Sequence, residues 1–349
     1  ATVPQTGPAG IGFISMLGWG NAVTILPEMM YRQFGDEEAL PRQYESMKLF
    51  VEAEIRKMGK KNLWIGPSLG DWLAMGKGIA WQAMHNNPVS NAFIVHDLKV
   101  ISETAERLGK REDAARYRRQ LAATTDAYIK KFVSKNGIVA KDYQSAYIMA
   151  LKYVLPEGEL RERVRKNFVA NIRKNGLQTG FFATEHLLPL LVEAGEQKLA
   201  YDVLLQENCP GWMYQVKCGA TTTWERWDAL KPDGTVNEEK MAGSGENMVS
   251  FNHYAFGSVG EFYYQYILGI RPEKPGFAKL HFAPYPDERL GGVSGSYLSV
   301  AGKIESAWRY EPDGCHIRLA TPVEAVVLLP DGRSENVPAG TYEWTVKRP

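Results

Sequence analysis

The amino-acid sequence predicts a mainly α protein in which helical hairpins are followed by a small antiparallel β domain. Apolar residues recur at helical spacing from about residue 15 to residue 270, and short loops separate most of the expected helices. Beyond residue 271 the sequence changes to short runs rich in β-branched and aromatic residues. A chain of 349 residues also predicts two domains, at about 150 residues each. We therefore expect a helical domain at residues 1–270 and a β domain at residues 271–349.

The clearest expected helix covers residues 88–109. Asn87 can cap it, Pro88 suits its first position, and Gly109 stops it after a stripe of apolar residues at helical spacing. The same spacing recurs over residues 111–133. Similar patterns predict further helices near residues 21–34, 38–58, 143–154, 158–174, 182–194, 196–206 and 250–268, roughly nine helices in all. Because the loops are short, we expect neighbouring helices to form antiparallel hairpins.

The β domain is expected to begin after a Pro-rich junction, RPEKPGF at residues 271–277. Two turns, Pro312-Asp313-Gly314 and Pro330-Asp331-Gly332, separate its later strands. Strands are expected over residues 297–300, 303–310, 315–320, 325–329 and 341–346. Helical hairpins in a ring, with a β-sandwich, are typical of (α/α)-barrel glycosidases. An α-solenoid and a toroidal cyclase share this pattern, so the pattern alone does not distinguish them from an (α/α)-barrel glycosidase.

Composition excludes several functional classes. The chain is 44% hydrophobic and 23% charged, which is typical of a soluble globular protein. Lys plus Arg number 41 and Asp plus Glu 40, so the basic excess of a nucleic-acid-binding protein is missing overall. The sequence holds no apolar stretch long enough to predict a membrane-spanning helix. The six His show no metal-ligand spacing and no Gly-rich phosphate loop is present, so we expect neither metal nor cofactor.

Aromatic residues point towards carbohydrate. Nine Trp and 17 Tyr are many for this length, and such side chains line sugar-binding clefts as readily as they fill a core. The densest segment is Pro210–Asp228, in which Trp224 and Trp227 flank Glu225. A carboxylate in an aromatic cleft suits a general base that activates water. The alternative is a buried pair of Glu225 with Arg226 that holds a loop.

Several motifs, in order along the chain, together carry a resemblance to a known family. The specific ones are TTTWERW, within GATTTWERWDA at 219–229, and NHYA, within MVSFNHYA at 248–255. Individually weaker ones are GWGNA at 18–22 with Pro27, GDWLA at 70–74, LQTGF at 177–181 with Leu187-Leu188, PGW at 210–212, LGI at 268–270, and VAGKI at 300–304 with Trp308. Over residues 3–349 the chain resembles the C-terminal half of the inverting α-L-rhamnosidases, glycoside hydrolase family 78.

This resemblance implies an (α/α)6-type helical barrel followed by a small antiparallel β-sandwich domain. It also implies hydrolysis of terminal α-L-rhamnosyl residues with inversion. The family's general base is the Glu of its TTxWERW motif, which corresponds to Glu225. The expected substrate-binding residues are Trp19, Asn21, Asp71, Trp72, Trp224, Asn252 and His253. Simpler roles compete: Trp19 and Trp72 can be core aromatics, Asp71 a helix cap, and His253 a core histidine.

Two departures from the family pattern matter. Asn21 stands where the family has Asp, so a charged contact to a sugar hydroxyl would become a neutral one, although Asn caps a helix equally well. The family's general acid lies in a DCPQRDERLGWTGD-like segment, upstream of the stretch with which this chain opens. We therefore expect the barrel to be incomplete at its N-terminal side. The missing N-terminal part of the same enzyme is expected to complete it and supply the acid.

We therefore expect the protein to be a glycoside hydrolase that acts on rhamnose-containing glycosides or polysaccharides, and we expect no nucleic-acid or membrane partner. A catalytically incomplete rhamnose-binding module and another (α/α)6 glycosidase are the alternatives. Within the chain, Asp36, Asp71, Glu185 and Asp228 are the candidates for a general acid, and none fits well. Residues 1–12 lack a Met start and a basic or apolar leader, so the native N-terminus is expected upstream. Cytoplasmic and periplasmic or secreted bacterial locations therefore both stay open.

Overall fold

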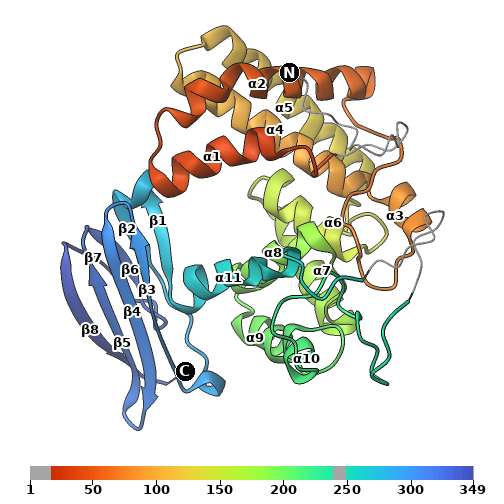
Figure 1. The fold of residues 1–349 in the computed structure, drawn as a ribbon. Coiled ribbons are helices and arrows are strands. Elements are labelled where there is room, and N and C mark those ends of the chain that lie inside the picture. The colour runs from red at the N-terminus through yellow and green to blue at the C-terminus, as the bar shows by residue number, and fades with distance from the viewer. Residues whose placement is uncertain (1–16, 239–248, 349) are drawn as a thin grey trace. The chain divides into compact units, whose positions relative to one another are not determined.

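The computed structural model describes residues 17–238 and 249–348 (Figure 1). These residues fall into two compact units. The helical unit comprises the chain up to Ile25 and from Gln43 to Ser258. The second unit comprises Leu26–Arg42 and the chain from Val259 onwards, and it contains all the β-strands described.

The helices are short to medium in length and follow one another closely. They are α1 (Ala22–Phe34), α2 (Ala39–Met58), α3 (Ile79–His85), α4 (Asn87–Arg107), α5 (Arg111–Phe132), α6 (Gln144–Met149), α7 (Glu159–Asn175), α8 (Phe181–Glu193), α9 (Gln197–Leu205), α10 (Trp212–Lys217) and α11 (Val259–Phe262). A π-helical segment, Ala150–Val154, continues α6, and a second, Tyr263–Ile267, continues α11. Helices α4 and α5 pack together as a hairpin, and so do α8 and α9 (Figure 1).

One core of the helical unit lies where α2, α4 and α5 meet. Tyr44 and Met47 of α2, Leu98 and Ile101 of α4, and Tyr117 of α5 belong to one buried cluster. Their spacing within each helix places them on one face, as the apolar periodicity of the sequence predicts. Burying such side chains supplies the main stabilisation of the hairpins, since each large apolar side chain contributes about 1.5–3 kcal/mol.

Most expected helices are confirmed, and three expectations need correction. Asn87 is the first residue of α4 rather than its cap, and the residue before it, Asn86, donates its amide to the Leu69 carbonyl instead of capping. The short helices α3 and α10 were not expected. The helix expected from residue 250 begins only at Ala255, because the backbone of 250–253 bonds to a neighbouring loop.

The second unit contains two four-stranded sheets. One has the order β1-β2-β6-β7 and the other β3-β4-β5-β8. The strands are β1 (Ile270–Lys274), β2 (Lys279–Phe282), β3 (Gly292–Ser299), β4 (Gly302–Glu311), β5 (Gly314–Thr321), β6 (Ala325–Leu328), β7 (Ser334–Val337) and β8 (Gly340–Val346). Phe282 of β2 stacks on Trp344 of β8 with ring centroids 6.2 Å apart, so the sheets face each other as a sandwich.

The expected strands at 303–310, 315–320, 325–329 and 341–346 are confirmed as β4, β5, β6 and β8. The expected junction RPEKPGF is partly wrong, because its first residues belong to β1. The strand expected at 297–300 is the end of the longer β3. The pairs are antiparallel with one exception, since β2 and β6 run parallel. Alternating burial along β4 places Ile304 and Trp308 in the core.

Candidate active site

Two segments that carry the specific motifs run side by side in the helical unit. The backbone N–H of Glu225 donates to the Ser250 carbonyl at 2.9 Å, and that of His253 donates to the Thr223 carbonyl at 2.8 Å. The Thr223 hydroxyl donates back to the His253 carbonyl at 2.6 Å. The structure therefore joins the TTTWERW and SFNHYA motifs through main-chain and threonine hydrogen bonds.

Two buried tryptophans fix the loop on either side of Glu225. Trp227 is fully buried, stacks on Phe256 at 3.8 Å between ring centroids, and donates its Nε1–H to the Thr179 carbonyl at 2.9 Å. Trp224 is also buried and meets the ring of Phe251 edge-on at 5.3 Å. Both indoles therefore serve as anchors. Glu225 between them is half-buried, so the expectation of an aromatic cleft around this carboxylate is met only in part.

The Glu225 carboxylate is uncommitted. Among the described residues it takes part in no side-chain hydrogen bond or ion pair, although its neighbours do. Arg226 forms a two-pronged pair with Asp228, with Nε to Oδ1 at 2.7 Å and Nη2 to Oδ2 at 3.2 Å. Asn237 donates to the same Asp228 carboxylate at 2.9 Å. The arginine of the motif thus stabilises the loop through Asp228 and leaves the Glu225 carboxylate without a pairing side chain among the described residues.

His253 presents one ring nitrogen for binding. Its Nδ1 accepts the backbone N–H of Ala255 at 3.2 Å, so the neutral ring carries its proton on Nε2. The ring packs between Phe181, at 4.8 Å, and Tyr254, at 5.0 Å. The adjacent Asn252 is exposed. Together these residues offer an N–H donor and an amide beside aromatic rings, which is the kind of surface that sugar hydroxyls and C–H groups require.

Phe181 connects this histidine to the N-terminal motif. Its ring lies 5.9 Å from that of Trp19, and Trp19 also packs on Phe182 at 4.9 Å. The Trp19 Nε1–H donates to the Gly70 carbonyl at 3.2 Å, and the indole is half-buried. The sequence predicted no role for Phe181, although it is the aromatic residue of the LQTGF motif. The structure thus brings Trp19, Phe181 and His253 into one aromatic row.

Asp71 lies under this row as a cap of α8. Its Oδ1 accepts the backbone N–H groups of Phe182, at 2.7 Å, and Ala183, at 3.2 Å. Its Oδ2 accepts from Gly180 N–H at 2.8 Å and the Ser145 hydroxyl at 2.5 Å. Burial raises the pKa of this carboxyl, and the four hydrogen bonds oppose that rise. The geometry favours the capping alternative over direct sugar contact.

The backbones of Trp72 and Gly180 are in direct contact, which brings Asp71 close to the start of α8. The Trp72 carbonyl accepts the backbone N–H of Phe181 at 3.1 Å, and the Trp72 ring is buried. A Cβ added at Gly180 would lie 2.1 Å from that carbonyl oxygen, so only glycine fits there. The GDW and TGF motifs are therefore parts of one packed junction.

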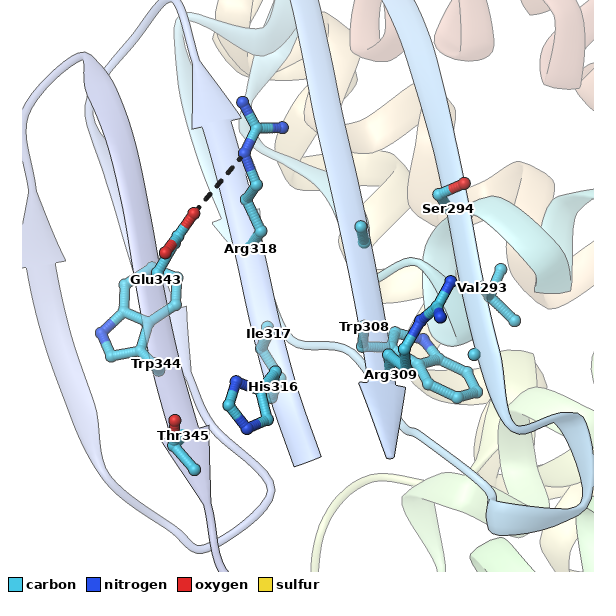
Figure 2. Close-up of a pocket in the computed structure, with 12 residues that line it drawn as sticks. Val293, Ser294, Trp308, Arg309, His316, Ile317, Arg318, Glu343, Trp344 and Thr345 are labelled. Carbon is cyan, nitrogen blue, oxygen red and sulfur yellow. Dashed lines mark ion pairs between the residues drawn. The ribbon is translucent and has the colours of Figure 1, made fainter. Parts of the chain in front are cut away.

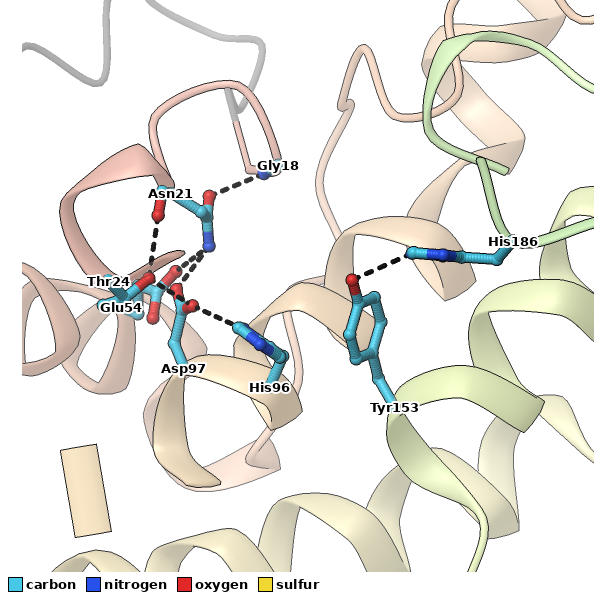
Figure 3. A network of polar contacts seen from close by, with 8 residues as sticks. All are labelled: Gly18, Asn21, Thr24, Glu54, His96, Asp97, Tyr153 and His186. Carbon is cyan, nitrogen blue, oxygen red and sulfur yellow. Dashed lines mark hydrogen bonds and ion pairs between the residues drawn. The ribbon is translucent and has the colours of Figure 1, made fainter. Parts of the chain in front are cut away.

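Asn21 also lies away from solvent. It is fully buried, and its carboxamide faces Glu54 and Asp97 (Figure 3). The sequence predicted a contact from Asn21 to a sugar hydroxyl, and this burial favours a structural role instead. A Tyr153–His186 hydrogen bond of 3.0 Å lies in the same region (Figure 3).

Among the described residues, a cavity in the β-strand unit also bears on binding. In the second unit, a cavity of about 450 Å³ opens on the outer face of the β3-β4-β5-β8 sheet, where Arg309, His316 and Arg318 project (Figure 2). It contains none of the expected site residues.

In the part of the chain that the structure describes, no three His, Cys, Asp or Glu side chains group as metal ligands. No helix of that part is both long and apolar enough to cross a membrane.

Comparison with protein families identifies both parts of the chain. Residues 1–267 match the bacterial alpha-L-rhamnosidase 6 hairpin glycosidase domain, and residues 269–342 match the bacterial alpha-L-rhamnosidase C-terminal domain. An alpha-L-rhamnosidase of Alteromonas sp. (strain LOR) is 34% identical over 314 residues, which cover 87% of this chain and 33% of that protein.

Solved structures agree. The crystal structure of native α-L-rhamnosidase from Aspergillus terreus matches with a TM-score of 0.87 and 30% identity, over 97% of this chain and 40% of that one. The Streptomyces avermitilis α-L-rhamnosidase complexed with L-rhamnose matches with a TM-score of 0.87 and 29% identity, over 98% and 34% of the two chains. The chain spans about a third of the length of the curated relatives that it matches. It belongs to the bacterial α-L-rhamnosidase family, with a six-hairpin glycosidase domain followed by the family's C-terminal domain.

Proposed function

We propose that the protein hydrolyses terminal α-L-rhamnosyl residues with inversion and that Glu225 is the general base. The observation that carries this proposal is the uncommitted Glu225 carboxylate, held by main-chain bonds next to the segment of Asn252 and His253. A carboxylate engaged in an ion pair would be a poor base, whereas no described residue forms an ion pair with this one. The general acid is proposed to come from sequence upstream of residue 1.

The proposed reaction follows the inverting scheme. Glu225 takes a proton from a water molecule as the water oxygen attacks the anomeric carbon, and the glycosidic bond breaks on the opposite face. The leaving oxygen receives a proton from the acid. The two carboxyl groups stand about 6.5–9.5 Å apart in such enzymes, which leaves room for the water. Each turnover returns the proton from Glu225 to the acid through solvent.

The proposed sugar pocket uses the aromatic row. Trp19 and Phe181 offer ring faces to the C–H groups and methyl of rhamnose, while His253 Nε2–H and the Asn252 amide bind hydroxyls. Asp71, Trp72 and Trp224 act by holding the segments that carry these groups. Family membership and the rhamnose complex of the Streptomyces avermitilis relative support the choice of sugar. We propose rhamnose-containing glycosides or polysaccharides as substrates, and a domain boundary at residue 270.

The test is hydrolysis of an aryl α-L-rhamnoside, followed by NMR of the first sugar anomer formed. We expect the β-anomer to form first, because inversion reverses the α configuration. Initial release of the α-anomer would overturn inversion and the role of Glu225 as a base for water. A panel of aryl glycosides with other sugars tests the choice of rhamnose, and preference for another sugar would overturn it.

The source of the acid is tested separately by comparing the 349-residue chain with a longer protein that includes the upstream sequence. We expect turnover from the longer form and none from the chain alone, although the chain should still bind L-rhamnose. Turnover by the 349-residue chain that disappears with Glu225→Gln would place the acid within residues 1–349. That result would contradict the upstream acid while leaving Glu225 as base.

A further inference from the structure

Three buried polar groups from three helical segments meet beneath the turn that carries Trp19. Asn21, just before α1, Glu54 of α2 and Asp97 of α4 are exposed by 0%, 1% and 0%. The Asn21 Nδ2 amide donates to both carboxyl groups, at 3.4 Å to Glu54 Oε1 and at a shorter distance to Asp97 Oδ2 (Figure 3). Its Oδ1 accepts the backbone N–H of Gly18 at 2.7 Å. A single carboxamide thus links two acids to the backbone of the turn.

The charges in this cluster do not balance if both acids are ionised. The Thr24 hydroxyl donates to Asp97 Oδ1 at 2.6 Å, and His96 Nδ1 lies 3.3 Å from the same oxygen. On α2, the charge of Lys57 opposes the rise in the pKa of Glu54, but burial and Asp97 raise it by more. Glu54 Oε2 is buried and has no hydrogen-bond partner among the described residues. Because the site is fully buried, ionising both carboxyl groups is costly, and a protonated His96 would pair with Asp97 and not with Glu54.

We propose that Glu54 and Asp97 hold one proton between them, and that Asn21, by donating to both, makes this pair the anchor that positions Trp19 at the sugar pocket. Asn21, Glu54 and Asp97 are therefore positioning residues. The role assigned to Trp19 rests on the proposed function, whereas the shared proton does not.

The direction of the pKa shift of Glu54 agrees with this geometry. Burial, and then the negative charge of Asp97, raise the pKa of Glu54 well above its usual range. The environment of Glu54 thus favours its neutral form. An Asp at position 21 would add a third carboxyl and remove the amide donor that both acids share. The Asn in the GWGNA motif thus supplies the hydrogen bonds that this cluster needs.

The link to Trp19 is short and rigid. Gly18 has φ +93°, and a Cβ there would lie 2.7 Å from the Phe182 ring and 2.9 Å from that of Phe93. The turn therefore has no space to shift towards those rings. Asn21 Oδ1 holds Gly18 from the other side. In the sequence Trp19 lies between Gly18 and Asn21, both of which are fixed. A change in the hydrogen bonds of Asn21 should therefore shift the Trp19 indole.

The first test is a charge swap in the 349-residue chain. At pH 8 we expect Asn21→Asp to lower Tm by roughly 5–10 °C, as a buried uncompensated charge does, and by less at pH 5. Adding Asp97→Asn should restore at least half of the loss, because the new amide would donate to the new carboxylate and accept from Thr24. The matched control is Asn136→Asp, which adds the same charge in an exposed turn. Equal Tm values for N21D and N136D, or no rescue, would overturn the proposal.

The second test isolates the shared proton with Glu54→Gln, which keeps a neutral side chain at every pH. A raised folded-state pKa means that the stability from neutral Glu54 is complete below about pH 4.5, the unfolded value, and is lost as pH rises through the folded value. The unsubstituted chain should therefore lose more stability than E54Q between pH 5 and pH 8. Parallel pH profiles would show that Glu54 holds no such proton.

The third test reads the position of Trp19. In chain labelled with 5-fluorotryptophan, the Trp19 resonance, assigned with Trp19→Phe, should move or broaden in N21D at pH 8, return in N21D/D97N, and stay unchanged in N136D. A Trp19 resonance that is unchanged in N21D would overturn the positioning role. L-Rhamnose affinity, measured by calorimetry, should follow the same order. If the unsubstituted chain binds no rhamnose, the proposed sugar pocket is wrong. The Tm and fluorine measurements would still test the shared proton and the position of Trp19.

Discussion

The backbone N–H of Glu225 donates to the carbonyl oxygen of Ser250 at 2.9 Å, which ties the proposed base to the segment of the proposed sugar contacts. The hydroxyl of Thr223 reinforces this pairing through the His253 carbonyl at 2.6 Å. The three consecutive threonines of the motif are thus not equivalent, since Thr223 is half-buried and bonded while Thr221 is exposed. The Thr223 side chain, two residues from the proposed base, thus helps to fix the backbone that carries Glu225.

Thr223→Val should therefore impair catalysis. The substitution keeps the shape of the side chain and removes one hydrogen bond, which costs about 1 kcal/mol and loosens the placement of both Glu225 and His253. We expect kcat/KM for an aryl α-L-rhamnoside to fall roughly 10-fold in a form of the protein that turns over. Thr221→Val is the matched control and should be neutral. Equal rates for the two variants would show that the pairing does not position the base.

Asp71→Asn tests the cap of α8. Asparagine has one acceptor oxygen where the carboxylate has two, so two of the four donors lose their partner. We expect a loss of about 2–4 kcal/mol in the free energy of unfolding, measured with urea. Asp126→Asn, on the exposed face of α5, is the control. Unchanged stability together with weaker rhamnose binding would instead support the direct sugar contact that the sequence suggested.

Phe181→Leu tests the aromatic row. The ring contacts of Phe181 with Trp19 and His253 would both disappear, and such contacts contribute about 0.5–1.5 kcal/mol each. We expect the Kd for L-rhamnose and the KM of an aryl rhamnoside to rise roughly 10-fold, with kcat nearly unchanged, as for a residue that binds ground state and transition state alike. Phe132→Leu removes a ring that packs on Tyr128 elsewhere and should leave both constants unchanged. A loss confined to kcat would contradict a binding role.

His186 predicts an acid-dependent loss of stability. Burial, followed by the charges of Lys152 and His96, lowers the pKa of this ring well below its usual 6.5. The unfolded chain takes up a proton as pH falls below about 6.5, and the folded chain does not. The stability tied to His186 is therefore complete above that pH and is lost progressively below it, by at most about 2 kcal/mol at pH 5. His186→Gln should remove this part of the loss, and identical losses in both proteins would refute it.

The helical periodicity of the sequence was sufficient to predict most of the fold. Helices with a clear apolar stripe, such as α4 and α5, were found within a few residues. The missed helices α3 and α10 are one or two turns long, too short for a stripe to recur. Strands β1, β2 and β7 were not expected; β7 is polar and largely exposed, so it lacks the alternation that marks a half-buried strand. Residues 250–254 have helical spacing but bond to the 222–225 loop, a tertiary effect that local patterns do not contain.

The candidate site was only partly predictable. Motif resemblance singled out Glu225, Trp19 and His253, which the structure leaves half-buried. Trp19 and His253 both pack on Phe181, and the loop of Glu225 pairs with the segment of His253. The same motifs singled out Asp71 and Asn21, which the structure buries under hydrogen bonds. Motif membership does not separate contact residues from the residues that hold them, because both kinds are equally specific in sequence. Phe181 was missed since a lone phenylalanine in a helix N-terminus is usually core.

The central claim is tested most directly by Glu225→Gln in a form of the protein that hydrolyses an aryl α-L-rhamnoside. Glutamine keeps the size of the side chain and cannot accept a proton from water at neutral pH. We expect kcat to fall by about 10³-fold or more, the range for loss of a general base, while L-rhamnose affinity changes little. Glu238→Gln, at an exposed position of the same loop, should be fully active. An E225Q variant that retains kcat would contradict the assignment of the base and the mechanism built on it.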